Sequence, residues 1–143
     1  MTRAFVDASV LFSACYSATG ASREILRFAI HGEVTLSISD VVKEEARRNL
    51  SNKAPKALPF LDQLLELVPF ETIIATKEEV LKAQEYTELK DAPIVAAAIK
   101  AKAHYLVSLD RVHLVDVSEV AKESGILIVL PGTLLHALRS KTE

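Results

Sequence analysis

Short runs of apolar residues recur along the chain, separated by longer stretches in which apolar and polar residues alternate with helical spacing. Runs this short and apolar are typical of strands buried on both faces, as in a parallel sheet. The longer stretches predict helices that connect one strand to the next. The predicted strands are 4–6, 34–38, 70–74, 105–108 and 126–130; the predicted helices are 22–31, one capped by Ser39, 60–67, 76–89, 91–101, 118–123 and 134–138, with a short helix and loop at 11–19.

This alternation predicts a three-layer α/β domain, in which a mostly parallel five-stranded sheet lies between two layers of helices. The chain has 143 residues, of which half are hydrophobic and a quarter are charged. That size is enough for one full hydrophobic core, so we expect a single domain over residues 1–143.

Several helix ends are marked by residues that cap helices. Thr76 with Glu79 three residues later forms the pattern of a capping box, at the start of a helix that runs to about Leu89. Asp91 followed by Pro93 indicates the first turn of an alanine-rich helix. The other expected signals are Ser22, Ser39 and Ser118 as N-caps, Gly32 and Gly125 as helix ends, and Pro131-Gly132 as a break before the last short helix.

Composition points to an intracellular chain without obvious affinity for nucleic acid. The formal net charge is −2 and the isoelectric point about 6.1. The single cysteine, Cys15, has no intramolecular disulfide partner, and the longest apolar runs are too short to cross a bilayer. The first residues lack the apolar region of a signal peptide, so we expect a cytoplasmic location. One stretch is locally basic, with Lys43, Arg47, Arg48, Lys53 and Lys56; taken alone, it is most simply a solvated helix face and loop.

Two aspartates follow predicted strands directly. Asp7 ends the strand 4–6 and Asp110 follows the strand 105–108. Strand-end residues of one parallel sheet meet at the same edge, where open α/β sheets bind their ligands. Each also has a simpler interpretation: Asp7 as a helix N-cap, and Asp110 as a loop residue paired with Arg111.

Two further acids are expected on helix faces that pack inward. Glu45 lies four residues after Val41 and three after Val42, whereas Glu44 points away from that apolar stripe. Asp91 precedes Ile94, Val95 and Ala98 by helical spacings. The simpler alternatives are an N-cap for Asp91 and an ion pair with Arg47 or Arg48 for Glu45.

Carboxylates that converge in a partly buried site repel one another unless a cation neutralises them. Oxygen ligands select hard ions such as Mg²⁺ or Mn²⁺. Such an ion at an open sheet edge can activate water and stabilise charge during displacement at a phosphodiester. The four histidines share no metal-ligand spacing; His113 lies close enough after Asp110 to contact a phosphate, and otherwise is a solvated loop residue.

The chain resembles the PIN domain, a metal-dependent ribonuclease fold found in VapC-type toxins. The resemblance rests on Phe5-Val6-Asp7-Ala8-Ser9-Val10-Leu11, on Ser39-Asp40-Val41-Val42-Lys43-Glu44-Glu45, and on Asp91-Ala92-Pro93-Ile94-Val95-Ala96-Ala97-Ala98 followed by Tyr105-Leu106-Val107-Ser108-Leu109-Asp110. It implies a parallel sheet of order 3-2-1-4-5. It also implies that Asp7, Glu45, Asp91 and Asp110 ligate one or two Mg²⁺ or Mn²⁺ ions.

The same resemblance predicts a function and partners. Ser9, where many members carry asparagine, and Ser108 would hydrogen-bond to an acid or to bound water. The chain would be an endoribonuclease and the toxin of a toxin–antitoxin pair, would form a homodimer, and would bind RNA with help from Arg47, Arg48, Lys53 or Lys56. Two alternatives are a PIN fold kept as a catalytically weak RNA-binding or scaffold module, and a receiver domain. The receiver domain needs a pair of acids after the first strand and a lysine after the last, and the chain has neither.

Overall fold

The computed structural model describes residues 1–17 and 19–142. Ala18 and Glu143, which belong to the predicted loop 11–19 and to the predicted domain 1–143, lie outside the described residues. A five-stranded sheet of order β3-β2-β1-β4-β5 forms the centre, and every neighbouring pair of strands is parallel. This confirms the predicted strand order. The strands are β1 (Arg3–Val6), β2 (Thr35–Ser39), β3 (Glu71–Ile73), β4 (Tyr105–Val107) and β5 (Leu127–Val129).

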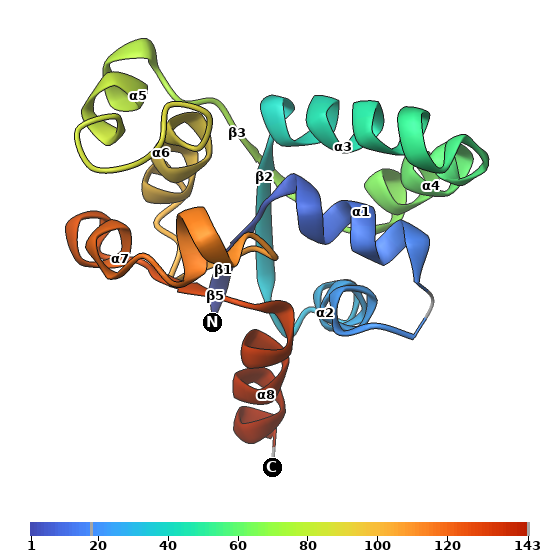
Figure 1. Cartoon of the computed structure of the whole chain (residues 1–143). Helices are drawn as coiled ribbons and strands as arrows, with labels where there is room; N and C mark the ends of the chain where they lie inside the picture. Colours follow the sequence, from blue (N-terminus) through green and yellow to red (C-terminus); the bar gives the residue numbers. More distant parts are fainter. Residues whose placement is uncertain (18, 143) are drawn as a thin grey trace.

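Helices cover both faces of the sheet, so the three-layer prediction is also confirmed (Figure 1). One layer contains α1 (Ala8–Tyr16), α2 (Ala21–Ile30), α3 (Asp40–Lys53) and α4 (Leu58–Leu67), with α8 (Pro131–Thr142) packed against α2. The other contains α5 (Lys77–Ala83), α6 (Ala92–Lys100) and α7 (Ser118–Ser124). None of the helices in the described part of the chain has the length and apolar character needed to span a bilayer.

Strand β1 lies at the middle of the sheet, and this position accounts for its continuous apolar sequence. It pairs with β2 on one side and with β4 on the other, and Ala4, Phe5 and Val6 are fully buried. A strand with neighbours on both edges and helices on both faces has no solvent side, so a continuous apolar run replaces the alternating pattern. The first polar residue after this run, Asp7, is therefore delivered to the carboxyl edge of the sheet.

Most predicted elements are present, but several of their ends are displaced. The capping box at Thr76 and Glu79 forms, with both reciprocal hydrogen bonds, yet its helix ends at Ala83 rather than near Leu89, and Leu89 is 71% exposed. Gly20, not Ser22, is the N-cap of α2, and Val117, not Ser118, precedes α7. The last helix is longer than expected, because Pro131 begins it: proline suits a first helical turn, where no N–H is needed.

One apolar residue predicted to face the core is instead exposed. Val41 on α3 keeps much of its side-chain surface in solvent. The buried stripe of α3 is Val42, Ala46 and Leu50, so the prediction was right for Val42 and wrong for Val41. Ser39 does cap this helix, since its hydroxyl accepts a hydrogen bond from the N–H of Val42 at 3.2 Å. Because α3 follows the carboxyl end of β2, and β2 is parallel to β1, the helix begins at the same edge of the sheet as Asp7.

Candidate functional site

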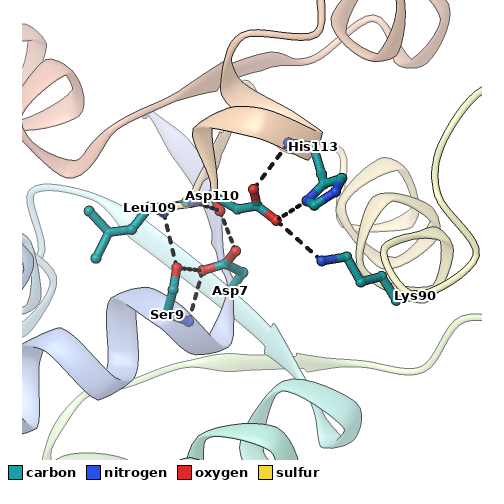
Figure 2. A network of polar contacts seen from close by, with 7 residues as sticks. Asp7, Ser9, Lys90, Leu109, Asp110 and His113 are labelled. Carbon is teal, nitrogen blue, oxygen red and sulfur yellow. Dashed lines mark hydrogen bonds and ion pairs between the residues drawn. The ribbon is translucent and has the colours of Figure 1, made fainter.

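Two strand ends bring their polar residues together at the carboxyl edge. Val6 of β1 is in register with Val107 of β4, and the N–H of Asp7 donates to the carbonyl of Val107 at 3.2 Å. Asp7 and Ser108 thus follow neighbouring strands at the same level. Figure 2 shows the polar network that grows from this point, with Asp7, Ser9, Asp110 and His113 directed toward one another.

The carboxylate of Asp7 is buried, with 5% of its surface exposed, and is held by hydrogen bonds on both oxygens. Oδ1 accepts from the N–H of Ser9 at 3.0 Å, from the Ser9 hydroxyl at 2.5 Å and from the N–H of Val10 at 3.4 Å. Asp7 therefore does cap α1, as the simpler interpretation proposed. Among the described residues, Oδ2 accepts only from the Ser108 hydroxyl, at 2.5 Å, which leaves it one lone pair for a further partner.

Burial raises the pKa of the Asp7 carboxyl above its ordinary value, and the hydrogen bonds from Ser108 and Ser9 oppose that rise. Burial destabilises the charged form because a carboxylate loses its hydration, whereas donors aimed at the oxygens replace part of that hydration. The site keeps an aspartate here at the expense of stability, and the two serines limit the loss.

Ser9 and Ser108 each join Asp7 to the loop that carries Asp110. A serine hydroxyl has one hydrogen to donate, and in both residues it goes to Asp7. The lone pairs then accept from the loop: the Ser9 oxygen from the N–H of Leu109 and the Ser108 oxygen from the N–H of Asp110, both at 3.0 Å. The two serines thus hold the start of the loop at a set position relative to Asp7, in keeping with their predicted supporting role.

Asp91 precedes α6, but its side chain does not cap the helix. Its backbone is in the helical region rather than the extended one, and its carboxylate makes no capping hydrogen bond. Only 6% of its surface is exposed, and Oδ2 has no hydrogen-bond partner among the described residues. Buried carboxylate oxygens nearly always have a partner, so this one requires an explanation.

The surroundings of Asp91 make its charge unfavourable. Burial raises the pKa of the Asp91 carboxyl; the charge of Lys90 opposes this rise, the carboxylate of Asp110 adds to it, His113 opposes it and Asp7 adds to it. Desolvation and like charges act in the same direction on a carboxylate, because both favour its protonated form. A bound cation would reverse both effects.

Asp110 is the N-cap residue directly before a π-helical turn, Arg111–Val115, that the sequence did not predict. Its Oδ1 accepts from the N–H of His113 at 3.1 Å, while Oδ2 lies 3.3 Å from Nδ1 of His113 and 3.8 Å from Nζ of Lys90. The alternative pairing of Asp110 with Arg111 is wrong, since Arg111 pairs with Asp116. Ligand atoms of Asp91, Asp110 and His113 all lie within 4.8 Å of one another; these three residues are called the edge cluster below.

Glu45 is not part of the edge cluster. It is half-buried on α3 while Glu44 is exposed, which agrees with the predicted choice between them. Because α3 begins at the same edge of the sheet, Glu45 remains a predicted ligand, but among the described residues no hydrogen bond or ion pair joins it to the other acids.

The four basic residues predicted to bind RNA lie further along the same layer. Arg47 is engaged by Asp62 at 2.7 Å, and the ammonium of Lys53 lies over the ring of Phe12. Arg48 and Lys56 are exposed. At the rise of an α-helix, Lys53 is about 20 Å along α3 from its start, and no ion pair among the described residues joins any of the four to the edge cluster. Their contact with RNA stays a prediction.

His113 is the cluster residue that sequence reasoning did not select. The sequence places His113 three residues after Asp110, but a loop between a strand and a helix does not predict that the imidazole ring turns back toward the acids. The π-helical turn accounts for this orientation, because the N–H of His113 donates to Asp110 and the imidazole ring then lies beside the Asp110 carboxylate. Such turns are rare in proteins as a whole, and those that occur are often found at functional sites.

The donor set of this edge fits a divalent cation. Asp91 provides a buried oxygen without a partner among the described residues, and Asp110 provides a second oxygen within reach. Asp7, whose charge acts on Asp91, offers a lone pair at the same edge of the sheet. Carboxylate oxygens are preferred ligands of Mg²⁺ and Mn²⁺. A cation would satisfy the unpartnered oxygen and remove the repulsion among the acids.

Replacing Ser108 with alanine should destabilise the fold. The substitution removes the donor that the described residues offer to Oδ2 of Asp7, which is buried, and the acceptor for the N–H of Asp110, which is partly buried. We expect a loss of about 1–3 kcal/mol in the free energy of unfolding, measured by urea denaturation at neutral pH. Ser51→Ala, an exposed serine on α3, is the matched control. Equal stability of the two variants would contradict the role assigned to Ser108.

Comparison with known proteins gives a consistent picture. A sequence model described as PIN domain matches residues 3–112, whereas no curated protein matches the chain. Among solved structures, PAE2754 from Pyrobaculum aerophilum has a TM-score of 0.68 at 23% identity, covering 97% of this chain and 90% of that one. VapBC2 from Rickettsia felis, bound to a promoter DNA fragment, has a TM-score of 0.63 at 14% identity and covers 90% and 98%. VapC20 from Mycobacterium tuberculosis, described as a toxin that cleaves the sarcin–ricin loop, has a TM-score of 0.52 at 18% identity and covers 76% and 91%. At these identities the likeness establishes the fold.

Proposed function

The chain belongs to the PIN domain family, and we propose that it is a divalent-metal-dependent endoribonuclease that hydrolyses phosphodiester bonds of RNA. PIN domains are nucleases. The observation that carries the proposal for this chain is the buried, unpartnered carboxylate oxygen of Asp91 beside Asp110, at the edge that also holds Asp7. A protein gains nothing in stability from such an arrangement, so a ligand is its simplest purpose.

The names of the structural neighbours support a toxin role. VapC20 is described as a toxin that cleaves an RNA loop, and VapBC2 is a complex bound to promoter DNA. We therefore propose that this chain is the toxin of a toxin–antitoxin pair and is inhibited by a protein partner. A homodimer, as in the prediction from the sequence, belongs to the same proposal, and sedimentation of the purified protein would test it.

The proposal assigns a role to each residue of the edge. Asp7, Asp91, Asp110 and Glu45 hold Mg²⁺ or Mn²⁺, and Ser9 and Ser108 keep Asp7 in place. When bound, the ion lowers the pKa of water and stabilises charge at the phosphodiester. Lys90, which lies near Asp110 with most of its side chain exposed, attracts the RNA backbone by its charge.

A cleft beside the cluster limits the direction from which RNA arrives. It has a volume of about 440 Å³ and includes Val112 and His113 of the π-helical turn and Glu85, Glu88 and Glu119 opposite. Three carboxylates repel a phosphate backbone. RNA is therefore expected to approach along α3, where Arg48 is exposed, rather than through this acidic cleft.

Cleavage of unstructured RNA, with Mn²⁺ or Mg²⁺ and with chelator, tests the proposed activity. The wild type should cleave only with the ion. Asp7→Asn should lose at least about 100-fold in rate, because residues that merely support a metal ligand already contribute about 10–100-fold. Asp116→Asn, an exposed acid six residues beyond Asp110, is the control and should retain full activity.

The same assay decides the role of Glu45. Glu45→Gln should reduce cleavage strongly and Glu44→Gln should not, because only Glu45 is on the partly buried side of α3.

Full activity in Asp7→Asn would contradict the metal assignment. Absence of cleavage by the wild type, together with absence of ion binding at millimolar concentration, would favour the catalytically weak RNA-binding or scaffold module.

A further inference from the structure

The edge cluster contains a nitrogen donor as well as two oxygen donors. Nδ1 of His113 lies 3.3 Å from Oδ2 of Asp110, and both are within 4.8 Å of a ligand atom of Asp91. At metal–ligand distances of about 2.1 Å, adjacent ligands of an octahedral ion lie about 3 Å apart. The spacing of the imidazole and the carboxylate is thus close to that of two ligands on one ion.

The position of the imidazole is fixed by the backbone. The N–H of His113 donates to Oδ1 of Asp110 at 3.1 Å, and Asp110 in turn is fixed by the bond from its N–H to the Ser108 hydroxyl. One short turn therefore presents a carboxylate and an imidazole on the same side (Figure 2). A solvated histidine needs neither this turn nor this orientation.

The second, independent observation comes from α6. Oδ2 of Asp91 is buried and has no partner among the described residues, although His113 and Lys90 are both nearby. If His113 acted only as a hydrogen-bond donor to the acids, Asp91 would be the carboxylate most in need of it. Instead, the imidazole lies at Asp110 and the Asp91 oxygen is left without a donor. This arrangement is expected if His113, Asp110 and Asp91 all bind one ion.

A mixed donor set discriminates between ions. Mg²⁺ is hard, prefers oxygen ligands and gives up its water reluctantly. Imidazole suits transition ions better than it suits Mg²⁺, and Mn²⁺ also takes the oxygen ligands that the acids offer. A nitrogen donor beside the carboxylates therefore favours Mn²⁺ over Mg²⁺.

We propose that His113 is a ligand of the ion at the edge cluster, and that the site consequently selects Mn²⁺ over Mg²⁺. This rests on the proposed function only in that both require an ion at this edge. It adds a residue that the four acids do not include, and it narrows the choice of ion.

Ion binding to the purified protein, without RNA, tests the inference. Calorimetric titration of the wild type should give an affinity for Mn²⁺ at least about tenfold above that for Mg²⁺. Pulsed electron paramagnetic resonance of the Mn²⁺-loaded protein should detect coupling to a directly bound ¹⁴N nucleus. In His113→Ala that coupling should vanish, and the affinity for Mn²⁺ should fall about tenfold while that for Mg²⁺ changes little.

Two further variants make the result specific. His136→Ala removes an exposed histidine of α8 and should keep both the nitrogen coupling and the preference for Mn²⁺. His113→Asp replaces the nitrogen donor with a carboxylate, so it should bind both ions but with the preference for Mn²⁺ reduced.

The inference is overturned if bound Mn²⁺ shows no nitrogen coupling in the wild type, if the coupling persists in His113→Ala, or if neither ion binds. The outcome is separable from that of the nuclease assay. Nitrogen-coupled Mn²⁺ in a protein that does not cleave RNA supports the ligand and contradicts the activity. Cleavage by a protein whose ion shows no nitrogen coupling supports the activity and contradicts the ligand.

Discussion

Asp91→Asn is expected to abolish cleavage and, at the same time, to make the ion-free protein more stable. The variant removes the buried oxygen that has no other partner, so the ion loses a ligand and the rate should fall by about 10²–10³-fold. The charge that the site needs is unfavourable to the fold, because it is desolvated and lies near Asp110 and Asp7. An amide at this position carries no charge and has an acceptor in the nearby Asp110.

The gain in stability should depend on pH in a defined direction. Because the pKa of Asp91 is raised above the ordinary value of 3.8, the folded protein binds this proton more tightly than the unfolded chain does. The contribution of Asp91 to stability is therefore fully present below the unfolded pKa and is lost as pH rises through the folded pKa. The difference in Tm between Asp91→Asn and wild type should grow with pH and then level off, at about 2–5 °C near neutrality.

Thermal unfolding in chelator over a range of pH, followed by the cleavage assay, measures both effects. Glu66→Gln, an exposed acid on α4, is the control and should change neither. Added Mn²⁺ should raise the Tm of the wild type more than that of Asp91→Asn. A variant that is less stable than the wild type at every pH would show that Asp91 contributes to the fold and would weaken its assignment as a ligand.

Phe5→Ala should produce the largest loss of stability of any substitution considered. The Phe5 side chain is fully buried in the central strand, with helices on both faces of the sheet. Truncation leaves a cavity that neighbouring strands cannot fill, and we expect a loss of about 3–5 kcal/mol. Since folded domains are stable by about 5–15 kcal/mol, a large part of the stability would disappear.

Urea denaturation of Phe5→Ala, compared with wild type, measures this loss. Leu67→Ala on α4, where the leucine is largely exposed, should stay within about 0.5 kcal/mol of the wild type. A loss at Phe5 below about 1.5 kcal/mol would mean that the core around β1 relaxes far more than a closely packed sheet allows.

The sequence was sufficient for those parts of the site that follow from strand position. Asp7 and Ser108 had to be neighbours once β1 and β4 were parallel and adjacent, and the capping residues Ser39 and Thr76 act over three residues, so local sequence determines them. The sheet order itself came from resemblance to a family, because an apolar run does not reveal which strand it pairs with.

The remaining parts depend on geometry that spacing alone does not encode. The end of α5 at Ala83 came six residues early, since residues 84–89 have no apolar stripe to hold them against the sheet and Leu89 is exposed. On α3 the buried stripe begins at Val42, and Val41 in the first turn is exposed, although the two adjacent valines are equally apolar in the sequence. The approach of His113 to Asp110 depends on a π-helical turn, for which no residue pattern was available.

The hydrogen bond between Asp7 and Ser108 joins residues that are 101 positions apart in the chain. Parallel pairing over such separations gives a high contact order, which slows folding. During synthesis, which proceeds from the N-terminus, β1 leaves the ribosome long before β4 exists. Nascent chains therefore carry Asp7 without Asp91, Asp110 or the serine that holds it, and so lack most of the residues proposed to hold the ion. The proposed cleavage activity is expected only after most of the chain has been translated.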